Sequence, residues 1–125
     1  METKGGARSI SVAAVRKMCS ALPGEVAEFP FGPGVRVYKA GGKLFALVPE
    51  GAPWSVSLKC DPVLARVLRE HHAGVTPGYH LNKQHWNTVA LDAGVPRYIV
   101  GQMITHSYEL VVASLPKRVR AELGE

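Results

Sequence analysis

Val35-Arg-Val-Tyr-Lys-Ala-Gly-Gly-Lys-Leu-Phe-Ala-Leu-Val48 is the stretch that decides the fold of this chain. Apolar and polar side chains alternate along residues 35–39, as they do in a strand that buries one face, and the mainly apolar residues 43–48 return after the glycine pair. Gly41 and Gly42 supply the positive backbone dihedrals that a tight two-residue turn requires. The stretch therefore predicts a β-hairpin with strands at residues 35–39 and 43–48.

Further strands are expected on either side of this hairpin. Residues 54–60 alternate again, with Trp54, Val56, Leu58 and Cys60 expected on one face and Ser55, Ser57 and Lys59 on the other. Residues 85–91 predict another strand. Residues 29–34 contain two prolines that cannot donate to a ladder, so they predict a constrained loop or a short edge strand.

Three helices are expected around these strands. Ser9 or Ser11 can cap a helix that Pro23-Gly24 ends, and Asp61-Pro62 is a typical helix start. Pro96 begins a long helix that Pro116 breaks, and residues 117–123 predict a short basic helical end. The apolar residues at helical spacing, which are expected to face the core, are Val12, Val15, Cys19, Leu22, Val63, Leu64, Val67, Leu68, Ile99, Met103, Ile104, Leu110 and Val111.

Together these elements predict an α+β domain. Hairpin-joined strands favour a mostly antiparallel sheet, and the amphipathic helices are expected to pack on one face of it. A chain of 125 residues forms one domain of ordinary size. We assign residues 9–125 to this domain and residues 1–8, which are rich in glycine and polar side chains, to a disordered lead-in.

Composition narrows the possible functions. The chain is 46% hydrophobic and 20% charged, with a net charge of +5, so a polyanionic partner is compatible with it. It has no signal-peptide pattern and no stretch long enough for a membrane span, which predicts a cytoplasmic protein with no membrane contact. Cys19 and Cys60 are expected to be buried, reduced thiols. No cofactor or metal site is expected, because Cys and His lack ligand spacing and the acids are sparse.

The stretch Thr76-Pro-Gly-Tyr-His-Leu-Asn-Lys-Gln-His-Trp-Asn-Thr88 combines amides, imidazoles, one cation and two aromatic rings. Such a mixture cannot all face an apolar core. It suits contact with a polar, planar or anionic partner, and it contains no recognisable nucleophile–base arrangement. We therefore expect a binding surface here, and no catalysis.

Several further blocks carry a family resemblance. They are Phe29-Pro-Phe-Gly-Pro33, Val37-Tyr-Lys39, Lys43-Leu-Phe-Ala46, Ser57-Leu-Lys-Cys60, Pro77-Gly-Tyr-His-Leu-Asn-Lys83, Trp86-Asn-Thr88 and Ser107-Tyr108. In this order they resemble the MmcQ/YjbR family of small bacterial proteins, from about residue 9 to residue 123. The resemblance implies a CyaY-like fold and a double-wing, DNA-binding role. Gln84 departs from the family pattern, because many relatives have a second basic residue there.

The resulting functional hypothesis is a non-catalytic DNA-binding protein. Phosphate contacts are expected from Arg36, Lys39, Lys43, Lys59 and Lys83, and polar or stacking contacts from Tyr79, His80, Asn82, His85, Trp86 and Asn87.

Two alternatives stay open. The chain could bind a small molecule or a partner protein in a polar pocket around residues 76–88. The same segment could instead be a structural latch, with Asn82, Asn87 and Thr88 satisfying backbone groups and Trp86 filling a gap between the sheet and the last helix. The sequence does not fix the oligomeric state.

Overall fold

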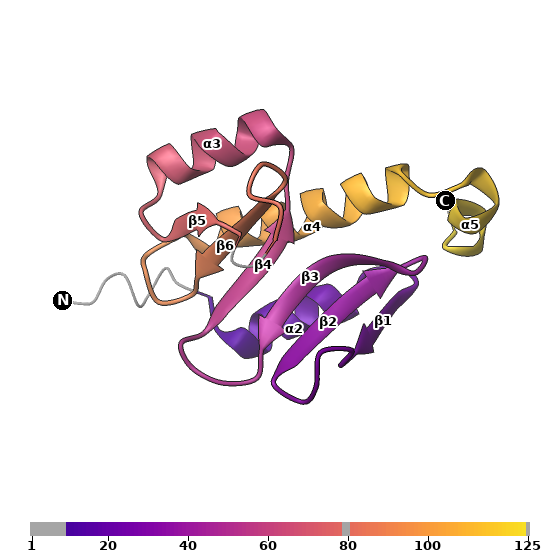
Figure 1. Ribbon diagram of the computed structural model, residues 1–125, viewed down its shortest axis with the longest axis horizontal. Coiled ribbons are helices and arrows are strands. Elements are labelled where there is room, and N and C mark those ends of the chain that lie inside the picture. Colours follow the sequence, from indigo (N-terminus) through magenta and orange to yellow (C-terminus); the bar gives the residue numbers. More distant parts are fainter. Residues whose placement is uncertain (1–9, 79–80, 125) are drawn as a thin grey trace.

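The hairpin lies within a six-stranded antiparallel sheet with the strand order β1-β2-β3-β4-β6-β5. The structure is a computed structural model and describes residues 10–78 and 81–124. The predicted lead-in at residues 1–8 lies outside the described residues. The strands are β1 (Glu25–Glu28), β2 (Val35–Ala40), β3 (Lys43–Pro49), β4 (Ser55–Lys59), β5 (Val75–Pro77) and β6 (Trp86–Ala90), and the helices are α2 (Val12–Ser20), α3 (Pro62–His71), α4 (Arg97–Ala113) and α5 (Lys117–Glu122). The predicted α+β architecture is confirmed (Figure 1).

Strands β2 and β3 form the predicted hairpin. Gly41 and Gly42 make the turn with φ values of 58° and 85°, a region that glycine enters without steric cost. The register shifts within the hairpin, because Tyr38 pairs with Ala46 while Lys39 pairs with Leu44. Phe45, the residue left between these partners, is fully buried, and its ring centroid lies 5.5 Å from that of Tyr108 on α4. The irregularity thus lets both Phe45 and Ala46 enter the core.

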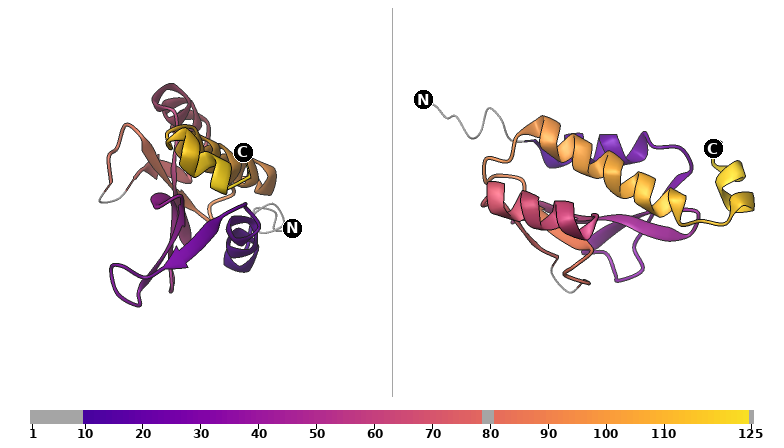
Figure 2. Two further views of the ribbon diagram at one scale, coloured as in Figure 1. Left: turned by 90° about the vertical axis from the view of Figure 1, so that its right-hand side faces the viewer. Right: turned by 90° about the horizontal axis from the view of Figure 1, so that it is seen from above.

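Helices α2 and α4 cover one face of the sheet, as Figure 2 shows. The core lies between this face and α4, where Val100, Ile104 and Val111 meet the side chains of Val56 and Leu58. Among the described residues no helix covers the opposite face, which we call the open face. None of the described helices is long and apolar enough to cross a membrane.

Helix α3 forms as predicted but buries a different face. Its N-cap is the Asp61 carboxylate, which accepts hydrogen bonds from two backbone N–H groups at 3.1 Å each. Val63, Leu64 and Val67 are 61%, 38% and 41% exposed, so their predicted inward orientation is wrong. The helix lies beside β5 and β6 and contacts the protein through Ala65, which is buried, together with Leu68 and Arg69.

Two short strands, β1 and β5, were not predicted from the sequence. β1 and β5 form the two edges of the sheet and contain four and three residues, which is too short for alternation to appear. Residues 29–34 form a loop, which was one of the two predictions for them, and the edge strand β1 lies just before this loop. Trp54 was also misplaced: it comes just before β4 and is 36% exposed, so the alternation of that strand does not extend to it.

The C-terminal helix α5 folds back beside the hairpin turn (Figure 1). A Cβ atom on Gly41 would lie 2.5 Å from Leu115 and 2.9 Å from Val119. Only a residue without a side chain allows this approach, so Gly41 serves both the turn and the docking of α5.

Candidate functional site

Four lysines of the predicted interface lie at one end of the sheet. Lys39 is near the end of β2, Lys43 begins β3, Lys59 ends β4, and Lys83 lies in the loop that leads into β6. Because neighbouring strands run in opposite directions, these positions share one end. We call this group of Lys39, Lys43, Lys59 and Lys83 the basic end.

Contacts within the protein position three of these amines. Lys39 forms an ion pair with Glu28 at 3.1 Å, Lys43 donates to the Ser114 hydroxyl at 3.2 Å, and Lys83 donates to the Gly78 carbonyl at 3.2 Å. The basic residues Lys117, Arg118 and Arg120 of α5 follow close to the same hairpin turn. The carboxylates of Glu25 and Asp61 also lie near this end, and they offset part of its positive charge.

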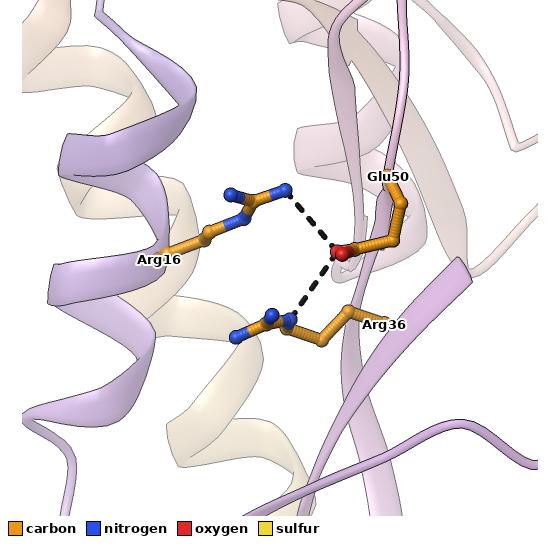
Figure 3. Close-up of polar contacts among 3 residues, drawn as sticks. All are labelled: Arg16, Arg36 and Glu50. Carbon is orange, nitrogen blue, oxygen red and sulfur yellow. Dashed lines mark hydrogen bonds and ion pairs between the residues drawn. The ribbon is translucent and has the colours of Figure 1, made fainter. Parts of the chain in front are cut away.

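Arg36 does not join the basic end. It lies near the other end of β2, where the Glu50 carboxylate accepts hydrogen bonds from Arg36 at 3.3 Å and from Arg16 of α2 at 3.1 Å (Figure 3). The Arg36 guanidinium lies 5.4 Å from the centroid of the Phe29 ring, and that of Arg16 lies 5.9 Å from the Trp54 ring. This pair of arginines thus ties α2 to the sheet and to two aromatic rings.

The segment at residues 76–88 divides into exposed and buried parts. Asn82 and Lys83 are exposed, and His85 is half-buried. Asn82 nevertheless organises the loop, because its side-chain oxygen accepts a hydrogen bond from the Gln84 backbone at 2.9 Å. Tyr79 and His80 lie outside the described residues.

Trp86 and Asn87 are the buried part of this segment. Trp86 pairs with Lys59 and Asn87 with Leu58, so the two side chains point to opposite faces of the sheet. Trp86 therefore lies on the face away from α4, and the expectation that it fills a gap beside the last helix is wrong. A Cβ atom on Gly78 would come within 2.7 Å of the Trp86 Cβ, so the segment passes closely over the tryptophan.

Arg69 of α3 is the residue that the sequence analysis missed. It donates to the Asn87 side-chain oxygen at 2.7 Å, to the Trp86 carbonyl at 3.3 Å and to the Lys83 carbonyl. The Asn87 amide donates in turn to the Ala65 carbonyl at 3.4 Å. This network fastens the segment to α3, and within it Asn87 satisfies a backbone carbonyl, as the structural alternative predicts. No local sequence signal connects Arg69 to residues that follow 14 to 18 positions later.

A pocket of about 780 Å³ occupies the open face. Thr76, Leu81 and Thr88 contribute to its lining, so it adjoins the place where a polar pocket was predicted. Its walls are mainly apolar rather than polar, with Phe31 and Trp54 among them. In its floor the hydroxyls of Ser57 and Thr88 lie 2.8 Å apart, within hydrogen-bond distance.

Both cysteines and Ser107 are buried. Burial, aided by Glu25, raises the pKa of Cys19 to about 12. Burial likewise raises the pKa of Cys60 to about 11, so both buried thiols are protonated at neutral pH. Ser107 donates to the Phe45 carbonyl at 2.6 Å and accepts from the Lys59 backbone, which joins α4 to two strands. Among the described residues no group of His, Cys, Asp or Glu could hold a metal ion.

The sequence of this chain is similar to those of several bacterial proteins. The sequence model of the YjbR family matches residues 20–110. The chain is 35% identical over 113 residues to the uncharacterized protein YjbR of Escherichia coli K12, covering 89% of this chain and 95% of that protein. It is 38% identical over 92 residues to the uncharacterized protein YbdF of Escherichia coli O157:H7, covering 72% and 75% of the two chains.

Solved structures share the fold. The crystal structure of protein DR2400 from Deinococcus radiodurans superposes with a TM-score of 0.85 at 39% identity and covers 91% of this chain and 88% of that one. A protein from Pseudomonas syringae, at 23% identity and a TM-score of 0.70, covers 82% and 99% and shares the fold.

Proposed function

The chain belongs to the YjbR family, and we propose that it acts as a nucleic-acid-binding protein without catalysis. The observation that supports this proposal is the gathering of Lys39, Lys43, Lys59 and Lys83 at one end of the sheet. Neutralising several phosphates requires several cations on one surface, and an antiparallel sheet supplies such a surface from residues far apart in sequence.

The spacing of the basic end suits a nucleic-acid backbone. From β2 across β3 and β4 to β6 there are three strand spacings, or about 14 Å at about 4.8 Å each. That span equals the rise of roughly four nucleotides along one strand of duplex DNA. The basic residues of α5 extend the same surface beyond the hairpin turn.

The lysines differ in their expected contribution. Lys39 is already paired with Glu28, and Lys83 is bonded to the Gly78 carbonyl, so each would have to exchange a partner for a phosphate. Lys43 would likewise have to leave the Ser114 hydroxyl, so Lys59 is expected to contribute most. Asn82 and His85 lie in the same loop as Lys83, and the His85 carbonyl accepts a hydrogen bond from the Cys60 backbone next to Lys59. Asn82 and His85 would supply polar contacts to the same nucleic-acid strand.

Salt titration tests the proposal. Binding of a fluorescent 16-base-pair duplex and of a single strand is measured by anisotropy at several salt concentrations. Removing one phosphate contact by Lys59→Ala should lower the slope of log K against log salt by about 0.9 for the duplex. The matched control is Arg97→Ala, which removes one exposed positive charge from the start of α4, and it should leave the slope unchanged.

Two results would overturn nucleic-acid binding at the basic end. One is the absence of binding to either oligonucleotide at low salt. The other is an equal effect of Arg97→Ala and Lys59→Ala, because that would mean attraction by net charge alone rather than by a particular surface.

A second candidate function is the binding of a small molecule or a partner protein at the open face. It is favoured by one observation, the concave apolar pocket of about 780 Å³ that Thr76, Leu81 and Thr88 help to line. Its volume lies within the usual range of small-molecule sites.

A further inference from the structure

The open face of the sheet has the shape of a ligand site rather than of a flat interface. The strands β2, β3, β4, β6 and β5 each contribute to the pocket, and residues from the connecting loops rise around it. Leu47, Ser57, Thr88 and Ala90 form part of the strand floor. Antiparallel sheets with one solvated face carry polar side chains there, and Leu47 and Ala90 depart from that pattern.

Two aromatic side chains stand at this pocket with unusual exposure. Phe31 is 69% and Trp54 is 36% exposed, although both are large apolar residues. Leaving such rings in water is unfavourable, at about 25 cal/mol for each Å² of apolar surface. A ligand that covers the two rings would recover that free energy on binding.

The ion-pair network described above holds the Trp54 wall in place. The guanidinium of Arg16 lies against the Trp54 ring, and Arg16 is itself fixed by Glu50, which also binds Arg36 (Figure 3). The end of the pocket is thus organised before any ligand arrives. Preorganisation of this kind reduces the ordering cost of binding.

The charges around the pocket indicate which ligands it would accept. Asp92 is a charged residue in its lining, and no Lys or Arg occurs among the described residues that line it. An anionic ligand would therefore lose its hydration without gaining a cationic partner, whereas a neutral or cationic ligand would not. The Ser57 and Thr88 hydroxyls place one polar spot in the floor, able to accept a hydrogen bond from the ligand.

From these features we propose that the open-face pocket binds a small, largely apolar, planar molecule that is neutral or cationic and carries one polar group. The inference rests on the second candidate function and specifies its ligand class. It is independent of nucleic-acid binding, because the basic end lies at the ends of the strands and contributes no lysine to the pocket.

A pair of dyes tests this inference on the intact protein. 1-Aminoanthracene, which is uncharged at pH 7.5, should bind one molecule per chain with enhanced fluorescence. 1-Anilinonaphthalene-8-sulfonate, of similar size but anionic, should bind at least tenfold more weakly. The substitution Ala90→Phe fills the floor and should weaken aminoanthracene binding at least tenfold, while the matched Ala27→Phe on the exposed edge strand β1 should leave it unchanged.

A second substitution covers the case in which Ala90→Phe fails to fold, as judged by circular dichroism. Ala73→Phe changes an exposed residue at the rim of the pocket and should also weaken aminoanthracene binding. Duplex DNA binding, measured in parallel on both variants, should stay as in the unmodified protein.

The possible failures are distinguishable. Saturable binding at this pocket with preference for the anionic dye would overturn the ligand class and leave the second candidate function standing. The absence of saturable binding, or binding that neither substitution weakens, would overturn both. Self-association that buries Trp54 and excludes the dye would mean that a second copy of the chain occupies the face, and would likewise overturn the inference.

Discussion

At the scale of single residues, the segment at 76–88 combines structural and surface roles. Asn87 is completely buried and is bonded to Arg69 and to the Ala65 carbonyl, so it fastens β6 to α3. Asn82 and Lys83 are exposed at the basic end. The latch interpretation therefore concerns the buried residues of the segment, whereas the proposed binding surface would use its exposed ones.

The substitution Asn87→Ala should lower the free energy of unfolding by about 2–3 kcal/mol, because it leaves the Arg69 guanidinium without its buried acceptor. The matched control is Asn82→Ala in the same segment. Asn82 is exposed and bonds only within its own loop, so its removal should cost about 1 kcal/mol or less. Urea unfolding of both variants measures the difference. A larger loss from Asn82→Ala than from Asn87→Ala would contradict the assignment of the latch.

At the scale of elements, helix α3 illustrates what periodicity predicts and what it leaves undecided. Asp61-Pro62 and the helical spacing gave the correct start and the correct element. The apolar spacing also indicated a buried face of Val63, Leu64, Val67 and Leu68, and three of these four are exposed. The buried side carries Ala65 and the half-buried Arg69, and the partners of Arg69 lie on β6 and in its preceding loop, where no pattern within the helix could indicate them.

Two leucines of α3 allow a direct comparison of its faces. Leu68 packs against the core, so Leu68→Ala should lower the free energy of unfolding by about 1–2 kcal/mol. Leu64 is 38% exposed, so Leu64→Ala should change it by about 0.5 kcal/mol or less. Both changes remove the same atoms from the same helix, and chemical denaturation compares them. Equal losses would mean that α3 buries the face first predicted from its sequence.

Some of the strands could be predicted from the sequence and others could not. The hairpin and the strand at residues 55–59 were predictable because glycine geometry and alternation are local properties. The edge strands β1 and β5 were not, since four and three residues gain their strand conformation from the neighbour they pair with. Likewise, Trp54 continued the alternation of β4 in sequence but left the strand at the pocket.

At the scale of the whole molecule, α5 and the hairpin turn depend on each other. Gly41 and Gly42 both have positive φ, but only Gly41 lies against Leu115 and Val119. This contact brings the basic residues of α5 close to Lys43.

Alanine at the two turn positions should therefore differ in effect. Gly42→Ala meets no atoms and should cost about 1 kcal/mol through its backbone conformation alone. Gly41→Ala adds overlap with the side chains of Leu115 and Val119 and should cost about 2–3 kcal/mol. It should also speed tryptic cleavage after Lys117 and Arg118, because α5 would be displaced. Equal stability and equal cleavage rates in the two variants would argue against the docking.

The sequence by itself determined the hairpin, the helix starts, the α+β class and the family resemblance that comparison confirmed. These follow from local backbone preferences and from side-chain order along the chain. Only the tertiary structure decided that Lys39, Lys43, Lys59 and Lys83 share one end while Arg36 lies at the other. It alone produced the apolar pocket on the open face. Both depend on strand direction and on which elements lie side by side, and these are relations between distant segments that no local pattern contains.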